Sequence, residues 1–221
     1  MKSKNNPLLV LHKKGAEATL SQIVFDGNKA VSKKRVVKSY RNAKLDALIR
    51  KERTRSEAKL LRHITSTVNA PMVFKVDEAN FEIILEFIDG KALKLVIEKE
   101  PSLAIEAGKC IRKIHDLGVI HGDLTTSNII VAQESSKKDS VDLELNKRIG
   151  QKGVLFFIDF GLGYFSKKLE DRATDLVVFK KTFNATHSSL KNGWELVLKG
   201  YSPSAELITR MEAIEKRARY H

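Results

Sequence analysis

Cysteine is almost absent from this sequence of 221 residues, and long apolar runs are missing as well. The single cysteine, Cys110, excludes an internal disulfide framework. No basic start followed by an apolar stretch and a small-residue cleavage site marks a secretory signal, and the apolar runs are far too short to span a bilayer. We therefore expect a soluble protein of the cytoplasm or nucleus with no membrane partner.

Acidic residues are too few to balance the basic ones, and the net charge is +13. Many of the lysines and arginines lie between Lys29 and Arg62. Simple solubility would account for such a charge, but its concentration favours an anionic partner such as nucleic acid or nucleotide. Aromatic residues are sparse in the same stretch. We therefore expect contact with phosphates rather than a base-stacking platform.

The first part of the chain reads as an antiparallel sheet with one helix. A long, charged, helix-favouring segment covers residues 43–64. Strand-like runs bounded by turn residues surround it at 7–12, 19–26, 34–40, 72–77 and 81–87. The 42% hydrophobic content is enough to bury a core in one large domain or two small lobes. We assign residues 1–87 to a first lobe.

The remainder, residues 88–221, is expected to be mainly helical, with a basic C-terminal tail. The Asp89-Gly90 pair gives a turn or hinge signal between the two parts. Helices are expected at 101–117, 172–186, 190–199 and 205–219, and two short strands flank a polar loop at 133–153. A two-lobed α+β plan follows, with the cleft between the lobes as the place for a ligand.

Two acidic loops carry the chemistry. "VIHGDLTTSNII" places Asp123 five residues before Asn128, and "FFIDFGLG" places Asp159 shortly before Gly161. An aspartate and an amide carbonyl are hard oxygen ligands for Mg²⁺, and a second aspartate can accept or orient a hydroxyl proton. The pattern indicates phosphoryl transfer.

A lysine and a glutamate precede these loops. Lys38 lies on the predicted strand 34–40, and Glu57 lies on the helical face that also carries Leu60 and Ile64. A glutamate on an apolar face needs a cationic partner, and Lys38 is the lysine that we expect to provide it. The alternative is a solvated lysine and an ordinary surface glutamate.

Taken together, the motifs resemble the protein-kinase-like fold. "GAEA" (15–18), "ERTRSEAKLL" (52–61), "IHGDLTTSN" (120–128) and "IDFGLGYFSKKLEDRATDLVVFKKTFNATH" (158–187) are similar, more narrowly, to the small atypical Ser/Thr kinase and ATPase of the KEOPS complex, the PRPK family. The similarity covers nearly the whole chain.

The resemblance implies ATP and Mg²⁺ as cofactors and a role for each matching residue. By this resemblance, Asp123 would be the catalytic aspartate, and Asn128 and Asp159 would be the magnesium ligands. The implied ATP-binding residues are Gly15, Ala16, Glu17 and Ala18 over the phosphates, Lys38 with its partner Glu57 on the phosphates, and Glu86 to Ile88 on adenine.

The sequence also departs from conventional protein kinases. Gly122 stands where they carry an arginine that reads a phosphorylated activation loop. No Ala-Pro-Glu follows Asp159, and the next helix is expected only about a dozen residues after Gly161. The peptide-docking platform is therefore absent or much reduced, which favours an ATPase or a partner-restricted kinase.

The family's complex installs threonylcarbamoyladenosine in tRNA. The resemblance therefore implies three partners: a threonylcarbamoyl-transferase subunit, a small adaptor subunit, and tRNA. The chain's C-terminal end departs from the basic tail of the family at Tyr220 and His221.

Several other polar or reactive residues are interpreted as framework. Asp175 is expected to be a buried acid that accepts backbone hydrogen bonds from the loop around His121. His115 and His121 lack the neighbours of a metal site. Cys110 and Trp194 are interpreted as packing residues.

Two alternatives stay open from the residues alone. One is a RIO-like kinase or small-molecule phosphotransferase, which would share "HGDL" and the trailing asparagine. The other is a non-catalytic RNA-binding scaffold that uses nucleotide only as a structural ligand.

Overall fold

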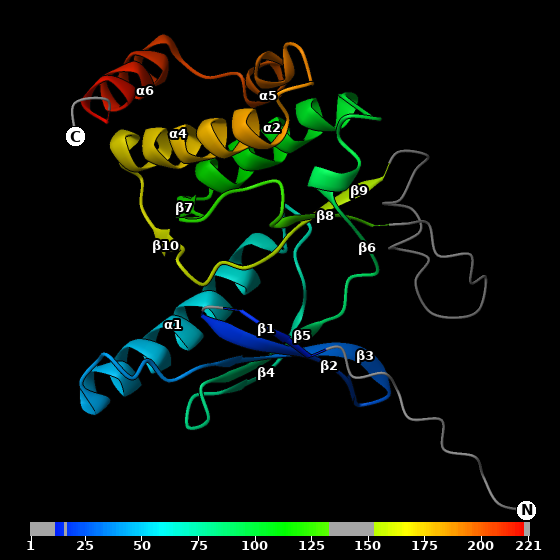
Figure 1. Ribbon diagram of the computed structural model, residues 1–221, viewed down its shortest axis with the longest axis vertical. Helices are drawn as coiled ribbons and strands as arrows, with labels where there is room; N and C mark the ends of the chain where they lie inside the picture. Colours follow the sequence, from blue (N-terminus) through cyan, green and yellow to red (C-terminus); the bar gives the residue numbers. More distant parts are fainter. Residues whose placement is uncertain (1–11, 16, 133–152, 219–221) are drawn as a thin grey trace, which may run out of the picture. The chain divides into compact units, whose positions relative to one another are not determined.

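The computed structural model describes residues 12–15, 17–132 and 153–218, which fall into two units (Figure 1). The first unit runs to Ala58 and includes Met72–Phe87. The second consists of Lys59–Pro71 and the chain from Ile88 onward. The lobe boundaries expected from the sequence, 1–87 and 88–221, stay a prediction.

The first unit contains a five-stranded antiparallel sheet in the order β1-β2-β3-β5-β4. Its strands are β1 (His12–Lys14), β2 (Ala18–Phe25), β3 (Asn28–Arg35), β4 (Val73–Asp77) and β5 (Glu82–Glu86). Asp26 and Gly27, with φ of 46° and 80°, form the two-residue turn between β2 and β3. Positive φ at both positions matches the twist of a tight hairpin, and the Asp-Gly pair tolerates it.

Helix α1 (Ala43–Ile64) begins where an asparagine can cap it. The side-chain oxygen of Asn42 accepts hydrogen bonds from the backbone N–H groups of Lys44 and Leu45, at 3.0 and 3.4 Å. Glu57 on this helix has no exposed surface, and neither do Leu60 and Ile64 further along the same face. The helix and its apolar face were predicted from the sequence, and both are confirmed.

The second unit combines helices with two small sheets. Its sheets have the order β6-β8-β9 and β10-β7, both antiparallel. In Figure 1, α5 lies beside α2, and α6 lies beside α4, as their contacts also show. The elements are β6 (Gly90–Ala92), the short helix η1 (Leu93–Leu95), α2 (Ser102–Asp116), β7 (Val119–Ile120), β8 (Ile129–Ala132), β9 (Val154–Phe157), β10 (Tyr164–Phe165), α4 (Leu169–Thr186), α5 (Gly193–Tyr201) and α6 (Ala205–Arg217).

Aromatic side chains form much of the interior of the second unit. Phe179 meets both Phe183 and Trp194 edge to face, with ring centroids 5.7 and 6.2 Å apart. All three rings are buried. The prediction that Trp194 is a packing residue is therefore confirmed.

One strand and the starts of two helices differ from the sequence-based expectation, since α5 begins at Gly193, three residues after its expected start. The strand expected at 34–40 is instead β3, which ends at Arg35. Helix α4 begins at Leu169, three residues before the expected start. Expectations for 7–11, for Ala16, for most of the 133–153 loop and for the tail at 219–221 lie outside the described residues. Within the described part, no helix is both long enough and apolar enough to cross a membrane.

Candidate functional site

The β8–β9 hairpin brings Asn128 and Asp159 to the same end of a sheet. Ile129 pairs with Phe157 in the antiparallel ladder, so Asn128 just precedes β8 where the chain leaves β9 toward Asp159. The backbone N–H of Ile158 donates to the carbonyl of Asn128 at 3.0 Å, which continues the pairing by one residue. Two residues about thirty positions apart in sequence are thus held next to each other.

Asn128 also holds Asp123. Its side-chain Nδ2 donates to the backbone carbonyl of Asp123 at 2.8 Å and to the Asp123 carboxylate at 3.2 Å. Because a carbonyl only accepts, this bond fixes the orientation of the amide and turns its oxygen Oδ1 away from Asp123. The carboxylates of Asp123 and Asp159 belong to exposed residues.

Asp159 adopts an uncommon backbone conformation, with φ of 64°. Its Oδ1 accepts a hydrogen bond of 3.3 Å from the N–H of Gly161. Left-handed conformations of residues other than glycine are strained, and aspartate is among the few residue types that tolerate them. The turn presents a carboxylate at the position where the sequence predicts a metal ligand.

The donor set of this loop pair fits magnesium. Asn128 Oδ1 and the Asp159 carboxylate are hard oxygen donors, and Mg²⁺ in phosphoryl-transfer sites takes few protein ligands because phosphate oxygens and water complete its shell. The described residues include no group of three or more His, Cys, Asp or Glu side chains suited to a metal ion. Asn128 and Asp159 are the two candidate ligands that these loops provide.

Asp175 on α4 anchors the loop that carries Asp123. One carboxylate oxygen accepts from the N–H of His121 at 3.1 Å and lies 3.1 Å from His115 Nε2. The other accepts from the N–H of Gly122 at 3.0 Å. Burial opposes ionisation, but the hydrogen bond and charge of His115 outweigh it, and the pKa of Asp175 is lowered. Asp175 is the buried acid that the sequence predicts.

The two framework histidines are confirmed as hydrogen-bonded. His115 is fully buried, and its Nδ1 lies 2.9 Å from the hydroxyl of Tyr201. His121 Nε2 lies 3.1 Å from the carbonyl of Ile158, while Nδ1 accepts from the N–H of Asp123 at 3.4 Å. Burial lowers the pKa of His121, so this residue is a neutral donor between the two acidic loops.

Gly122 is required by the backbone of the same loop. Its φ is 79°, and a Cβ atom there would lie 2.3 Å from the carbonyl oxygen of Leu162. A side chain at this position would therefore have to displace the chain that follows Asp159. Helix α4 begins eight residues after Gly161, so the segment between them is even shorter than expected.

In the first unit, Glu57 pairs with residues that the sequence analysis missed. Lys33 Nζ lies 2.6 Å from Glu57 Oε1, and Arg35 Nη2 lies 2.6 Å from Oε2. All three side chains are buried. The expected Lys38–Glu57 pair is wrong, because β3 ends at Arg35 and Lys38 lies beyond it. The tight Asp26-Gly27 turn was the signal that would have placed the strand earlier.

Lys38 instead joins the loop that precedes β2. Its Nζ lies 3.4 Å from Glu17 Oε1, and Arg53 of α1 lies 2.8 Å from Glu17 Oε2. The N–H of Gly15 donates to the carbonyl of Ala18 at 2.9 Å, which closes a tight turn. The Glu17 carboxylate thus forms ion pairs with two cationic side chains. Ala16 lies outside the described residues.

The two residues expected at adenine flank the end of β5. Glu86 is the last residue of β5, and its N–H donates to the carbonyl of Met72 at 2.9 Å. Its carboxylate accepts from the N–H of Met72 at 3.1 Å. Ile88 is the first residue of the second unit after this strand. Their adenine contacts stay a prediction.

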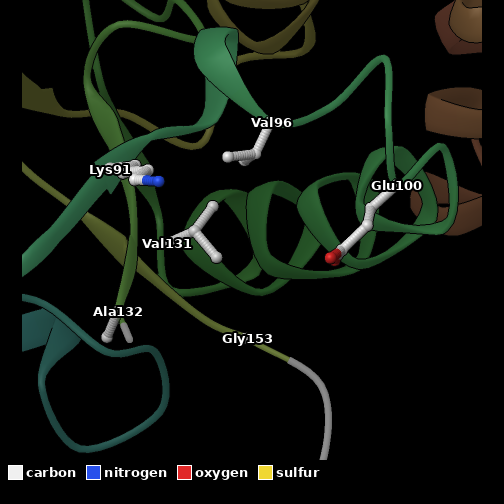
Figure 2. Close-up of a pocket in the computed structure, with 6 residues that line it drawn as sticks. All are labelled: Lys91, Val96, Glu100, Val131, Ala132 and Gly153. Atoms are coloured by element: carbon white, nitrogen blue, oxygen red, sulfur yellow. The ribbon is translucent and has the colours of Figure 1, made fainter. Parts of the chain in front are cut away.

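A separate pocket of about 220 Å³ lies in the second unit (Figure 2). None of the predicted site residues lines it. Its lining residues come from β6, β8, the segment before α2 and the residue before β9: Lys91, Val96, Glu100, Val131, Ala132 and Gly153. The thiol of Cys110 is likewise separate from the two loops, and burial raises its pKa to about 11.

Comparison with known proteins gives close relatives, although no protein-family model matches the chain. The KEOPS complex subunit Bud32 of Pyrococcus abyssi is 37% identical, over 95% of this chain and 96% of that protein. A probable bifunctional tRNA threonylcarbamoyladenosine biosynthesis protein of Methanobrevibacter smithii is 39% identical over 94% of this chain. The chain spans only 36% of that bifunctional protein.

Solved structures establish the fold. The Rio2 kinase of Chaetomium thermophilum, in an ADP/Mg²⁺-phosphoaspartate complex, superposes with a TM-score of 0.61 at 15% identity, covering 95% of this chain and 70% of that one. WaaP, in complex with acyl carrier protein, gives 0.59 at 14% identity, covering 93% and 86%. The expected protein-kinase-like α+β fold, with an antiparallel sheet and one helix followed by a mainly helical part, is confirmed.

Proposed function

Because the chain belongs to the family of the KEOPS complex subunit Bud32, we propose that it is an atypical Ser/Thr kinase and ATPase that uses Mg-ATP to support threonylcarbamoyladenosine formation in tRNA. The observation that carries the proposal is the joining of Asp123, Asn128 and Asp159 by the β8–β9 hairpin and the Asn128 side chain. The relatives' names support the tRNA modification, and the loop geometry supports the chemistry.

Asp123 is the residue that handles the proton in this proposal. Asn128 holds its carboxylate, and the loop behind it is anchored by Asp175 through the N–H groups of His121 and Gly122. An exposed, oriented carboxylate can accept the proton of an attacking water or hydroxyl group. His121 is neutral and holds the Asp159 loop through the carbonyl of Ile158, so it does not compete for that proton.

Asn128 and Asp159 would hold magnesium through Oδ1 and the carboxylate. A magnesium ion held there would supply positive charge against the negative charge that develops on the phosphates during transfer. We assign the phosphate-binding role to Lys33 rather than Lys38. The Glu57 carboxylate holds the Lys33 ammonium group, and this lysine–glutamate pair is the arrangement that kinases use for the α- and β-phosphates.

The partners of this activity are proposed from the relatives' names and the resemblance. The relatives include proteins named bifunctional, of whose length this chain matches about a third. We propose that a threonylcarbamoyl-transferase subunit is a partner of this chain, with a small adaptor subunit and tRNA completing the assembly. Its location would be the cytoplasm or nucleus.

The test follows the γ-phosphate of labelled ATP with magnesium, for the chain alone and with the transferase subunit. We expect release of labelled phosphate that the transferase stimulates, and loss of turnover by at least about a hundredfold in Asp159→Asn. Circular dichroism and thermal melting of that variant check that it folds. Label transferred to a protein side chain would favour the kinase activity over hydrolysis. Unchanged turnover in Asp159→Asn would refute the catalytic assignment.

A further inference from the structure

His187 follows the last residue of α4 in the "ATHS" segment (185–188), which the assignment above leaves without a role. Its ring is buried and contacts two side chains from other parts of the second unit. Nε2 lies 2.9 Å from the hydroxyl oxygen of Thr126, and Nδ1 lies 3.4 Å from Glu98 Oε1. The ring also packs against Phe183 at 5.1 Å. His187 is therefore fixed on several sides.

Thr126 lies in the turn between Asp123 and Asn128. It is buried, whereas Asp123 is exposed and Asn128 is half-buried. Its backbone carbonyl accepts from the N–H of Lys94 at 3.1 Å. Its side-chain hydroxyl group is hydrogen-bonded to His187. Thr126 is thus the buried anchor of this turn, tied to η1 by its backbone and to the end of α4 by its side chain.

The two contacts of the imidazole indicate which ring nitrogen donates toward Glu98. A carboxylate only accepts, so Nδ1 carries the hydrogen that faces Glu98. In the neutral ring, Nε2 is then an acceptor, and the Thr126 hydroxyl donates to it. The arrangement resembles a carboxylate–imidazole–hydroxyl relay in its connectivity, but the buried hydroxyl has no access to a substrate and serves as an attachment point.

We propose that His187 is a positioning residue that, through the Thr126 hydroxyl, holds the turn carrying Asp123 and Asn128 in the geometry for phosphoryl transfer. It touches none of the reacting atoms. Its loss should slow the chemical step while leaving the affinity for ATP nearly unchanged, because the contacts proposed for the nucleotide lie on other residues. The inference rests on the proposed function for its kinetic part.

Thr126→Val and Thr126→Ser form a matched pair for the test. Valine keeps the shape and removes the hydroxyl, whereas serine keeps the hydroxyl. We expect Thr126→Val to lower kcat about tenfold with KM for ATP within about twofold, because the valine variant loses the buried hydrogen bond that holds the turn. Thr126→Ser should retain most of the turnover. Equal kcat in the two variants would overturn the inference.

A double-mutant cycle connects the hydroxyl to the imidazole. If Thr126→Val and His187→Gln remove the same interaction, the double variant is about as slow as Thr126→Val rather than slower by the product of the two effects. If the loss of kcat in the double variant equals the product of the two single losses, the Thr126 hydroxyl and the His187 ring act independently and the inference is contradicted. Thr182→Val is a control, because the Thr182 hydroxyl bonds only to carbonyls of its own helix. His63→Gln, at the exposed His63, is the second control and should leave kcat unchanged.

Hydrogen exchange separates this inference from the proposed function. Mass spectrometry of the 119–130 segment should show faster amide exchange in Thr126→Val than in Thr126→Ser, whether or not ATP is turned over. If the wild-type protein hydrolyses ATP but the two variants exchange and turn over alike, the inference fails and the proposed function stands. If the wild-type protein has no turnover, the proposed function fails and the exchange comparison alone decides the inference.

Discussion

At the scale of single residues, the two lysines near the predicted phosphate-binding position differ in environment. Lys33 is buried and lies 2.6 Å from the fully buried Glu57, while Lys38 pairs with Glu17, whose side chain is 48% exposed. A charge held in a buried pair keeps one position, whereas an exposed pair contributes little and is screened by salt. Lys33 is therefore the better-oriented cation.

We expect Lys33→Ala to reduce ATP turnover by about a hundredfold or more, and Lys38→Ala to change it by less than about fivefold. Steady-state kinetics with magnesium and ATP measures both variants. Because Lys33→Ala removes one of the two charged partners of Glu57 and leaves Arg35 in place, it should also destabilise the fold by about 1.5–3 kcal/mol, so turnover is compared at a temperature where both variants are folded. Loss of activity in Lys38→Ala but not in Lys33→Ala would show that Lys38 binds the phosphates, as the sequence analysis expected.

Single residues were predicted correctly from the sequence where the local pattern alone determines their environment. Asp175 was placed correctly because a lone acid in an apolar helix needs partners, and backbone N–H groups of a nearby loop provide them. Lys33 was missed because lysines stand at both 33 and 34, and strand alternation alone does not say where a strand ends. The pairing of β3 with β2 and β5, which fixes that end, depends on contacts far apart in the chain.

At the scale of secondary-structure elements, patterns with strong local signals were predicted most closely. Helix α1 has the bounds expected, because Asn42 caps its start and its apolar face repeats over many turns. The start of α4 was missed by three residues. The Ser166 hydroxyl accepts from the N–H of Lys168 at 3.1 Å and also bonds to Asp171, so the helix begins earlier than its hydrophobic residues indicate.

Two glycines with nearly equal φ allow a matched test of how the loop around each glycine affects stability and ATP turnover. Gly122 and Gly27 have φ of 79° and 80°, but a Cβ at Gly122 meets the carbonyl of Leu162 at 2.3 Å, and a Cβ at Gly27 meets nothing within 4 Å. Gly27→Ala should cost only the backbone strain, about 1–2 kcal/mol, and leave ATP turnover unchanged. Gly122→Ala adds a clash, so we expect a larger loss of stability, about 2–5 kcal/mol, together with a marked loss of turnover.

Denaturant unfolding and ATP turnover of the two glycine variants measure these effects side by side. Both variants carry the same cost of placing alanine at positive φ, so the difference between them measures the clash of the new Cβ at position 122 with the Leu162 carbonyl. Equal destabilisation of both variants would mean that the loop around Gly122 relaxes freely, and that the chain after Asp159 is not held where the structure places it.

At the scale of the whole molecule, each unit carries its own part of the chemistry. The first holds the Lys33–Glu57–Arg35 cluster, and the second holds Asp123, Asn128 and Asp159. The sequence pointed to Glu57 in the first group and to all three residues of the second, and the order of these motifs along the chain led to the kinase-like fold. What the pattern did not contain was the pairing within each group, which arises from sheet register and helix packing.

The excess of positive charge is also a property of the whole chain, and it leads to a prediction about tRNA. With a net charge of +13, the chain should bind tRNA mainly through phosphates, so affinity should fall steeply with salt. A site that engages even two phosphates loses about tenfold in affinity between 50 and 200 mM salt. Fluorescence anisotropy with labelled tRNA measures the slope of log Kd against log salt. Lys44→Glu, at an exposed position on α1, should flatten that slope if the first unit contributes. A Kd independent of salt would instead indicate base stacking or shape recognition and would exclude the charge of the chain as the basis of binding.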